Sequence, residues 1–129
     1  MSTYAFGKTV PLAFDDACKR VTEALAKEGF GVLTEIDVAA TMKKKLDLVI
    51  PPYKILGACN PHFASQAIAA EPQIGALLPC NVVVRQDAAG KVIVEFMDPN
   101  AVLKLVERPE VHGIAAQVRD KLVRVMNSL

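Results

Sequence analysis

The residues best suited to chemistry stand in two short runs that each contain Cys-Asn, namely Cys59-Asn60-Pro61 and Cys80-Asn81. An ionised thiol is a nucleophile and a soft metal ligand, and a primary amide both donates and accepts hydrogen bonds. The first run ends the apolar segment 53–58, and the second opens the valine-rich segment 82–85. If these segments are strands that pair antiparallel, the end of one lies beside the start of the other. We therefore expect Cys59 and Cys80 to be near neighbours.

The first run also has a structural use. Asn60 can cap the free amides of a helix that begins immediately after it, and Pro61 suits the first helical position. Cys59 is then the last residue of a strand beside a helix N-terminus, whose partial positive charge lowers the pKa of a nearby thiol.

Three interpretations of the cysteine pair remain open. Both thiols can be small buried core residues, which is the usual place of a free cysteine. A nucleophilic or redox role requires an exposed thiol of lowered pKa. A metal site would recruit His62 together with Cys59 and Cys80, but these three side chains leave a tetrahedral zinc site one ligand short or open to water.

The chain is long enough for one domain with a substantial core, over residues 1–129, and 52% of its residues are apolar. Fifteen basic and fourteen acidic residues leave a formal charge of +1, which is against nucleic-acid binding and against attraction to anionic lipid. No apolar stretch is long enough to span a membrane, and the N-terminus has no signal-peptide pattern. Three cysteines, an odd number, do not suit a secreted disulfide framework, so we expect a cytoplasmic protein with reduced thiols.

Hydrophobic periodicity predicts an α+β domain. Helices are expected at 14–28, at the alanine-rich segment 61–70 and at 111–126, with a short polar helix or loop at 38–47 and a brief helical segment at 99–105. Strands are expected at 4–10, 30–37, 53–59, 82–86 and 92–97, the last two joined as a hairpin through Gly90. Three consecutive valines at 82–84 suggest a strand that is buried on both faces.

Charged candidates lie outside the two Cys-Asn runs. Glu35 is either a solvated residue of its strand or a carboxylate at the margin of the core that needs a partner. Lys45 belongs to a lysine run that is usually a solvated face, and its alternative use is an anion site or a contact with Glu35. Cys18 falls on the apolar stripe of the first helix, so we expect it to be structural.

The two Cys-Asn runs, together with further motifs, resemble a known family. The matching segments include Tyr53 to Pro61, Ile74-Gly75, Leu78 to Val84 and Asp98-Pro99, and upstream Glu28 to Val32, Glu35 to Asp37 and Lys45. In these features the whole chain is similar to the family catalogued as domain of unknown function 302 (DUF302).

The resemblance implies chiefly a fold and an assembly. It implies an antiparallel sheet with helices packed on one face, in β-α-β(4)-α order and of the TATA-binding-protein-like class, with a homodimer as the assembly. It implies no established reaction, substrate or cofactor. The positions of this sequence that it singles out are Glu35, Asp37, Lys45, Cys59, Asn60, Pro61, Cys80 and Asn81. A fold shared with a DNA-binding protein does not imply DNA binding, because function belongs to sites.

These observations lead to three hypotheses. The first is a small dimeric domain that binds a small ligand or ion near Cys59, Asn60, Cys80 and Glu35, since the residues form no recognisable nucleophile, base and orienting group of an enzyme. The second is a thiol-based redox protein or enzyme that uses Cys59 or Cys80. The third is a purely structural or interaction protein.

Overall fold

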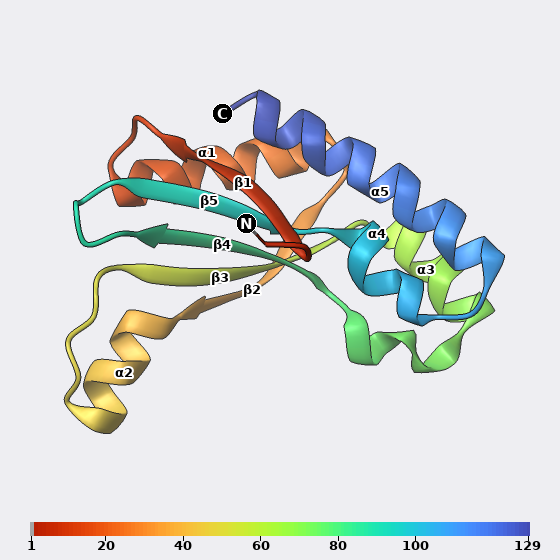
Figure 1. Ribbon diagram of the computed structural model, residues 1–129, viewed down its shortest axis with the longest axis horizontal. Helices are drawn as coiled ribbons and strands as arrows, with labels where there is room; N and C mark the ends of the chain where they lie inside the picture. Colours follow the sequence, from red (N-terminus) through yellow and green to blue (C-terminus); the bar gives the residue numbers. More distant parts are fainter. Residues whose placement is uncertain (1) are drawn as a thin grey trace.

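The computed structural model describes residues 2–129 as a sheet of five antiparallel strands with helices on one side (Figure 1). The order along the chain is β1 (Ala5–Val10), α1 (Phe14–Lys27), β2 (Gly31–Asp37), α2 (Val38–Leu46), β3 (Tyr53–Cys59), α3 (Pro61–Ala70), the 3-10 helix η1 (Pro72–Leu77), β4 (Cys80–Gln86), β5 (Val92–Met97), α4 (Pro99–Val102), the 3-10 helix η2 (Leu103–Leu105) and α5 (Pro109–Asn127). The strands lie in the order β1-β5-β4-β3-β2. The predicted α+β class with helices on one face is therefore confirmed, and each predicted helix and strand is present.

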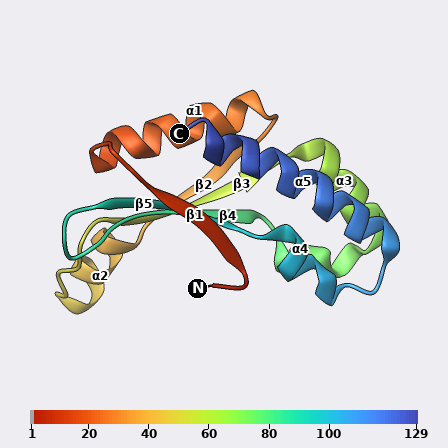
Figure 2. The ribbon, with the colours of Figure 1, turned by 45° about the horizontal axis from the view of Figure 1, so that its top comes forward.

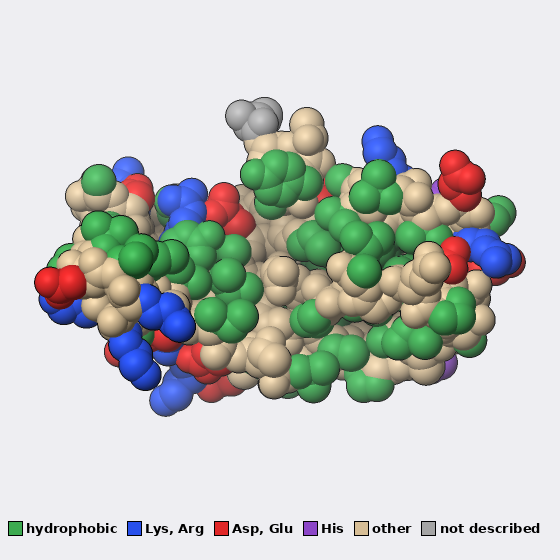
Figure 3. Space-filling model, turned by 90° about the horizontal axis from the view of Figure 1, so that it is seen from below, with side chains coloured by type: hydrophobic (Ala, Val, Ile, Leu, Met, Phe, Trp, Pro, Cys, Tyr) green, Lys and Arg blue, Asp and Glu red, His purple; other side chains and the backbone are tan. Residues whose placement is uncertain are grey.

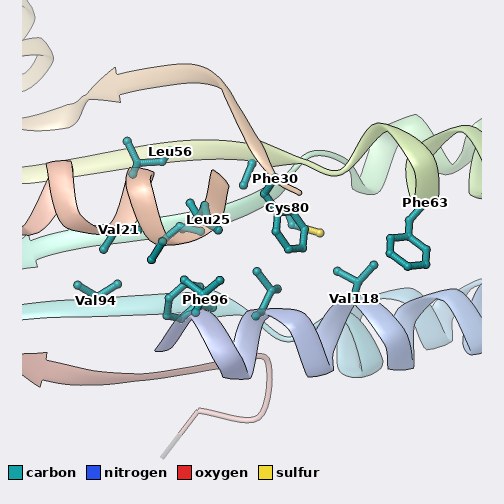
Figure 4. Close-up of a cluster of buried hydrophobic side chains, with 14 of the residues drawn as sticks. Val21, Leu25, Phe30, Leu56, Phe63, Cys80, Val94, Phe96 and Val118 are labelled. Atoms are coloured by element: carbon teal, nitrogen blue, oxygen red, sulfur yellow. The ribbon is translucent and has the colours of Figure 1, made fainter. Parts of the chain in front are cut away.

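Buried and more exposed residues alternate along the central strands, and the buried ones form the core. In β4 and β5 every second residue is buried, and these inward residues are Cys80, Val82 and Val84 on β4 and Val92, Val94 and Phe96 on β5. Val21 and Leu25 of α1 and Val111, Leu122 and Val125 of α5 are also fully buried among them. Figure 4 shows Val21 and Leu25 directed from α1 toward the side chains of the sheet. The core is mostly aliphatic, with Phe30, Phe63 and Phe96 as its buried aromatic residues.

Only one face of the sheet is covered by helices. Figure 2 shows α1 and α5 above the sheet and α2 below its level, on the opposite side. Val83, the middle valine of the three, points to the uncovered face and is half-buried, whereas Val82 and Val84 are fully buried. The prediction of a strand buried on both faces is therefore wrong for this single chain.

A group of helices extends beyond one end of the sheet. It consists of α3, η1, α4, η2 and the N-terminal half of α5, at the right of Figure 1. Ion pairs join its parts and attach it to the rest: Arg108 Nε lies 3.7 Å from Glu71 Oε2, and Arg119 Nε lies 3.2 Å from Asp98 Oδ2. No helix within residues 2–129 has the length and apolar character needed to cross a bilayer.

Truncation of the central core residue tests this packing. Phe96 is fully buried and stacks on Phe6 with 5.6 Å between ring centroids. Phe96→Ala removes a large buried ring, so we expect the free energy of unfolding to fall by about 3–5 kcal/mol in urea denaturation. Leu105→Ala is the control, because Leu105 is 71% exposed, and its effect should stay within about 0.5 kcal/mol. Equal effects of the two substitutions would contradict this packing.

Candidate functional site

An apolar pocket lies where the helical group meets the end of the sheet. This apolar pocket has a volume of about 270 Å³. Sixteen residues line it: Phe30, Leu33, Ala58, Cys59, Asn60, Phe63, Ala64, Ala67, Ile68, Gly75, Leu78, Pro79, Cys80, Leu103, Ile114 and Val118. None of these side chains is charged, and Asn60 is the single amide among them.

The register of β3 against β4 places both cysteines at this pocket. Ala58 pairs with Cys80, so Cys59 lies one residue beyond that pair at the end of β3. Cys59 is half-buried and Cys80 is buried, with 7% of its surface exposed. In Figure 4 the sulfur of Cys80 points toward Val118 and Phe63. The expectation that the pairing of two antiparallel strands brings the two Cys-Asn runs together is confirmed.

Burial controls the chemistry of Cys80. Removal of the thiol from water disfavours its charged form and raises the pKa of Cys80 from 9.0 to about 11, with a smaller contribution from the nearby Cys59. At neutral pH Cys80 is therefore a neutral thiol, and it behaves as a small apolar side chain of the pocket wall.

Both polar atoms of the Asn60 side chain form hydrogen bonds with backbone groups. Its Oδ1 accepts from the N–H of Phe63 at 3.5 Å and so caps α3, while its Nδ2 donates to the carbonyl of Glu28 at 3.4 Å. The predicted cap, with Pro61 in the first turn of α3, is confirmed. The second bond joins the start of α3 to the end of α1. Asn60 therefore shapes the pocket, and its polar atoms already have partners there.

An irregularity in β2 forms one side of the pocket. The register between β2 and β3 shifts between Val32 and Thr34, so Leu33 is an extra residue that is 67% exposed and lines the pocket. Bulges of this kind redirect a side chain and often lie next to binding sites. Gly57 permits this arrangement, because a Cβ at its position would lie 2.2 Å from Thr34 Oγ1 and 3.0 Å from Pro79.

The charged residues predicted for the site lie elsewhere. Glu35 is an exposed residue of β2 whose Oε1 accepts from Lys54 Nζ at 2.6 Å, a bond that raises the pKa of Lys54. Asp37 caps α2, since its Oδ1 accepts from the N–H of Ala40 at 2.9 Å, and Lys45 is exposed on the same helix. The partner of Glu35 is thus Lys54 rather than Lys45. None of these residues lines the apolar pocket.

Asp37 and Lys54 line a second, more polar hollow near the start of α1. Cys18 of α1 lies close to this group, and burial raises the pKa of its thiol. Cys18 packs against the core, in agreement with its predicted structural role.

Two further candidate site residues also lie away from the apolar pocket. Asn81 pairs with Gly57 and lies on the uncovered face of the sheet, on the side opposite Cys80. His62 is exposed in the first turn of α3, where its Nε2 lies 3.3 Å from Gln66 Nε2. Within residues 2–129 no three side chains of His, Cys, Asp or Glu come together as a group that could hold a metal ion, so Cys59, His62 and Cys80 do not form the metal site considered from the sequence.

Sequence reasoning missed most of the pocket wall. Leu33, Phe63, Ile68, Gly75, Leu103 and Val118 come from five different elements and carry no chemical signal of their own. The alanines of α3 carry a partial signal, because small side chains allow another element to approach closely, and Ala64 and Ala67 line the pocket whereas Ala70 does not.

The fold and the pocket together define a class: a two-layer α+β domain with an uncharged pocket at the junction between its sheet and a terminal group of helices. A family model described as "Domain of unknown function DUF302" matches residues 6–129, so this chain belongs to the DUF302 family. It is similar to the crystal structure of an uncharacterized conserved DUF302 protein from Bacillus stearothermophilus. The TM-score is 0.90 and the sequence identity 27%, over 98% of each chain. A comparison with curated proteins gives no match.

The raised pKa of Cys80 has a measurable consequence for stability. The unfolded chain loses the thiol proton near its ordinary pKa of 9.0, while the folded chain keeps it until about pH 11. The contribution of this group is therefore fully present below pH 9 and is lost as the pH rises toward 11. We expect the free energy of unfolding of the unsubstituted protein to fall across this range by on the order of 2 kcal/mol more than that of Cys80→Ala.

The measurement is urea denaturation of the unsubstituted protein and of Cys80→Ala at several pH values from roughly 8 to 11.5. Groups that titrate in both proteins contribute equally to the two free energies of unfolding, so the difference between these free energies reports Cys80. Parallel pH dependences of the two proteins would contradict a buried neutral thiol at this position.

Proposed function

We propose that this protein binds a small, uncharged and largely apolar molecule in the apolar pocket. The observation that carries the proposal is the composition of the wall, in which hydrocarbon side chains surround two thiols and one amide whose polar atoms are already bonded. A concave, mostly apolar hollow with few polar groups is the usual form of a small-molecule site.

The same wall argues against an ion as the occupant. An ion transferred into an apolar site requires compensating charges or several hydrogen bonds, and the wall offers neither. Of the small ligand and the ion that the sequence left open, the neutral ligand is the one that this wall favours. Glu35 has no part in the proposal, because it does not line the pocket.

The pocket can be blocked at one position. Gly75 lines the pocket, and a Cβ added there would meet no atom within 4 Å. Gly75→Leu should therefore place a side chain at the pocket without displacing its neighbours. Gly113 of α5 has the same open surroundings but does not line the pocket, so Gly113→Leu is the matched control.

We expect the uncharged fluorescent probe N-phenyl-1-naphthylamine to bind the unsubstituted protein with an increase in its emission. Gly75→Leu should weaken binding of the probe at least about tenfold, or roughly 1.4 kcal/mol, and Gly113→Leu should leave it unchanged. Titration of the probe, with circular dichroism to confirm folding of each variant, is the measurement. Equal binding by all three proteins would show that the probe sits elsewhere and would count against the proposal.

Thiol chemistry is the second candidate, and the observation in its favour is the position of Cys59, half-buried on the wall of the same pocket. Cys80 does not suit it. With a pKa of about 11, only about one molecule in a thousand carries a Cys80 thiolate at pH 8. A nucleophile of this protein would therefore be Cys59, with Cys80 as a neutral neighbour.

Reaction with Ellman's reagent at pH 8 compares the reactivity of the Cys59 and Cys80 thiols. We expect Cys59 to react first and Cys80 to react at least about tenfold more slowly, because only the thiolate attacks and Cys80 is buried. Cys59→Ser should remove the fast phase, and Cys18→Ser is the control that should keep it. A fast phase that survives Cys59→Ser would contradict the assignment.

A further inference from the structure

A second hollow lies on the open face of the sheet, the face that α1 and α5 do not cover (Figure 2). Its volume of about 320 Å³ is within the roughly 300–1,000 Å³ that is usual for small-molecule sites. Val83 of β4 and Glu95 of β5 lie opposite each other in the sheet, and Asn81 lies two residues along β4 on the same face. The side chains of the hollow that matter for binding are Tyr4, Tyr53, Asn81, Val83, Glu95 and Met97.

Asn81 has no structural role that accounts for it. Asparagine is uncommon in strands, and β4 is the central strand of the sheet. Asn60, the asparagine of the other Cys-Asn run, forms two hydrogen bonds with backbone groups. Asn81 is exposed at the open-face hollow, and its amide forms no hydrogen bond with another side chain of residues 2–129. A residue that departs from local preference without a structural gain is typical of a functional site.

The charges near the open-face hollow compensate each other. Among residues 2–129, Glu95 is the single charged residue that lines the hollow, and its Oε1 lies 2.6 Å from Nε of Arg85 on the neighbouring strand. No lysine or arginine of the described chain lines the hollow, so it offers no cation to a phosphate or carboxylate. In Figure 3 charged side chains gather toward the two ends of the molecule, and the middle of that surface is mostly hydrophobic or uncharged. An uncharged ligand suits this environment.

The uncharged groups favour a flat ring with a polar edge. Tyr4 and Tyr53 supply aromatic rings, on which a planar heterocycle can stack. The amide of Asn81 presents an N–H donor beside a carbonyl acceptor, and this pair matches an amino group next to a ring nitrogen, as in adenine. Glu95 bonds to its arginine through Oε1, so Oε2 can accept a further N–H or O–H from a ligand.

We propose that the open-face hollow binds a flat, uncharged nitrogen heterocycle that carries an amino group beside a ring nitrogen, as adenine does. The Asn81 amide pairs with that edge of the ring, and the two tyrosines contact the ring system. The ligand is a free base or nucleoside rather than a base within a nucleic acid, because no cation lines the hollow to hold the flanking phosphates. Asn81 lies on the side of β4 opposite Cys80, so this site is separate from the apolar pocket and does not rest on the proposed function.

The test is isothermal titration calorimetry of adenosine with the full chain. We expect saturable binding of one adenosine per chain. Asn81→Ala should weaken this binding at least about fivefold, because it removes both hydrogen bonds to the ring edge. Asn100→Ala is the matched control, since Asn100 is an exposed asparagine of α4 that does not line the hollow, and its affinity should be unchanged.

A modified ligand tests how the ring edge is recognised. The compound 6-dimethylaminopurine riboside lacks the N–H donors of the adenosine amino group. It should bind the unsubstituted protein at least about fivefold more weakly than adenosine, and the two ligands should bind Asn81→Ala equally. Tyr4→Leu, at a residue that is 66% exposed, removes an aromatic ring and should weaken both ligands alike. Circular dichroism confirms that each variant is folded.

Absence of adenosine binding to the folded chain, or equal affinities of the unsubstituted protein and Asn81→Ala, would overturn the proposal. Gly75→Leu, which blocks the apolar pocket, should leave adenosine binding unchanged, and loss of binding there would assign adenosine to that pocket instead. A single-stranded oligo-deoxyadenylate that binds more tightly than adenosine, with an affinity that falls as salt is added, would assign the hollow to nucleic acid and also overturn the proposal. A chain that binds N-phenyl-1-naphthylamine but not adenosine keeps the proposed function and lacks this second site.

Discussion

The antiparallel pairing of β3 with β4 is the contact on which the rest of the molecule depends. It joins the first half of the chain to the second, and its register of Ala58 with Cys80 decides which end of the sheet carries the cysteines. A shift of one residue would turn Leu56, Val82 and Val84 out of the core. Gly57 is needed at this place because Thr34 and Pro79 approach it more closely than a side chain allows.

The polar side chains at the end of the sheet cap helices and link neighbouring elements. Asn60 links the last carbonyl of the α1 segment to the first turn of α3, and this link holds the wall of the pocket against α1. Asp98 has a similar role at α4, where its Oδ1 accepts from Asn100 N–H at 3.0 Å and its Oδ2 lies near Arg119. With the polar atoms so used, the remaining surface of the pocket is hydrocarbon and thiol. The same hydrogen bonds of these polar side chains therefore shape the pocket and leave its wall without free polar groups.

The two faces of the sheet differ in what covers them within the chain. The inner face is closed by α1 and α5 of the same chain, and its apolar residues on β3, β4 and β5 are almost completely buried. The outer face presents aliphatic residues around a single ion pair, and α2 projects beside it without a buried residue of its own.

The sequence by itself determined the order and type of the elements, the Asn60 cap, the hairpin at Gly90 and the nearness of Cys59 to Cys80. These depend on local periodicity, capping and strand polarity, which neighbouring residues decide. The DUF302 motifs carry the same local information, and the family is confirmed. Glu35, Asp37 and Lys45 were grouped with the cysteines by motif alone.

Only the tertiary structure decided that these charged residues lie apart from the pocket, that Glu35 pairs with Lys54 and that one face of the valine strand stays open. It also decided the pocket wall, which gathers apolar side chains from distant elements such as Leu33, Gly75 and Val118. Apolar contacts are not directional, so no spacing in the sequence specifies which of them meet. The closure of the helical group over the end of the sheet selects them.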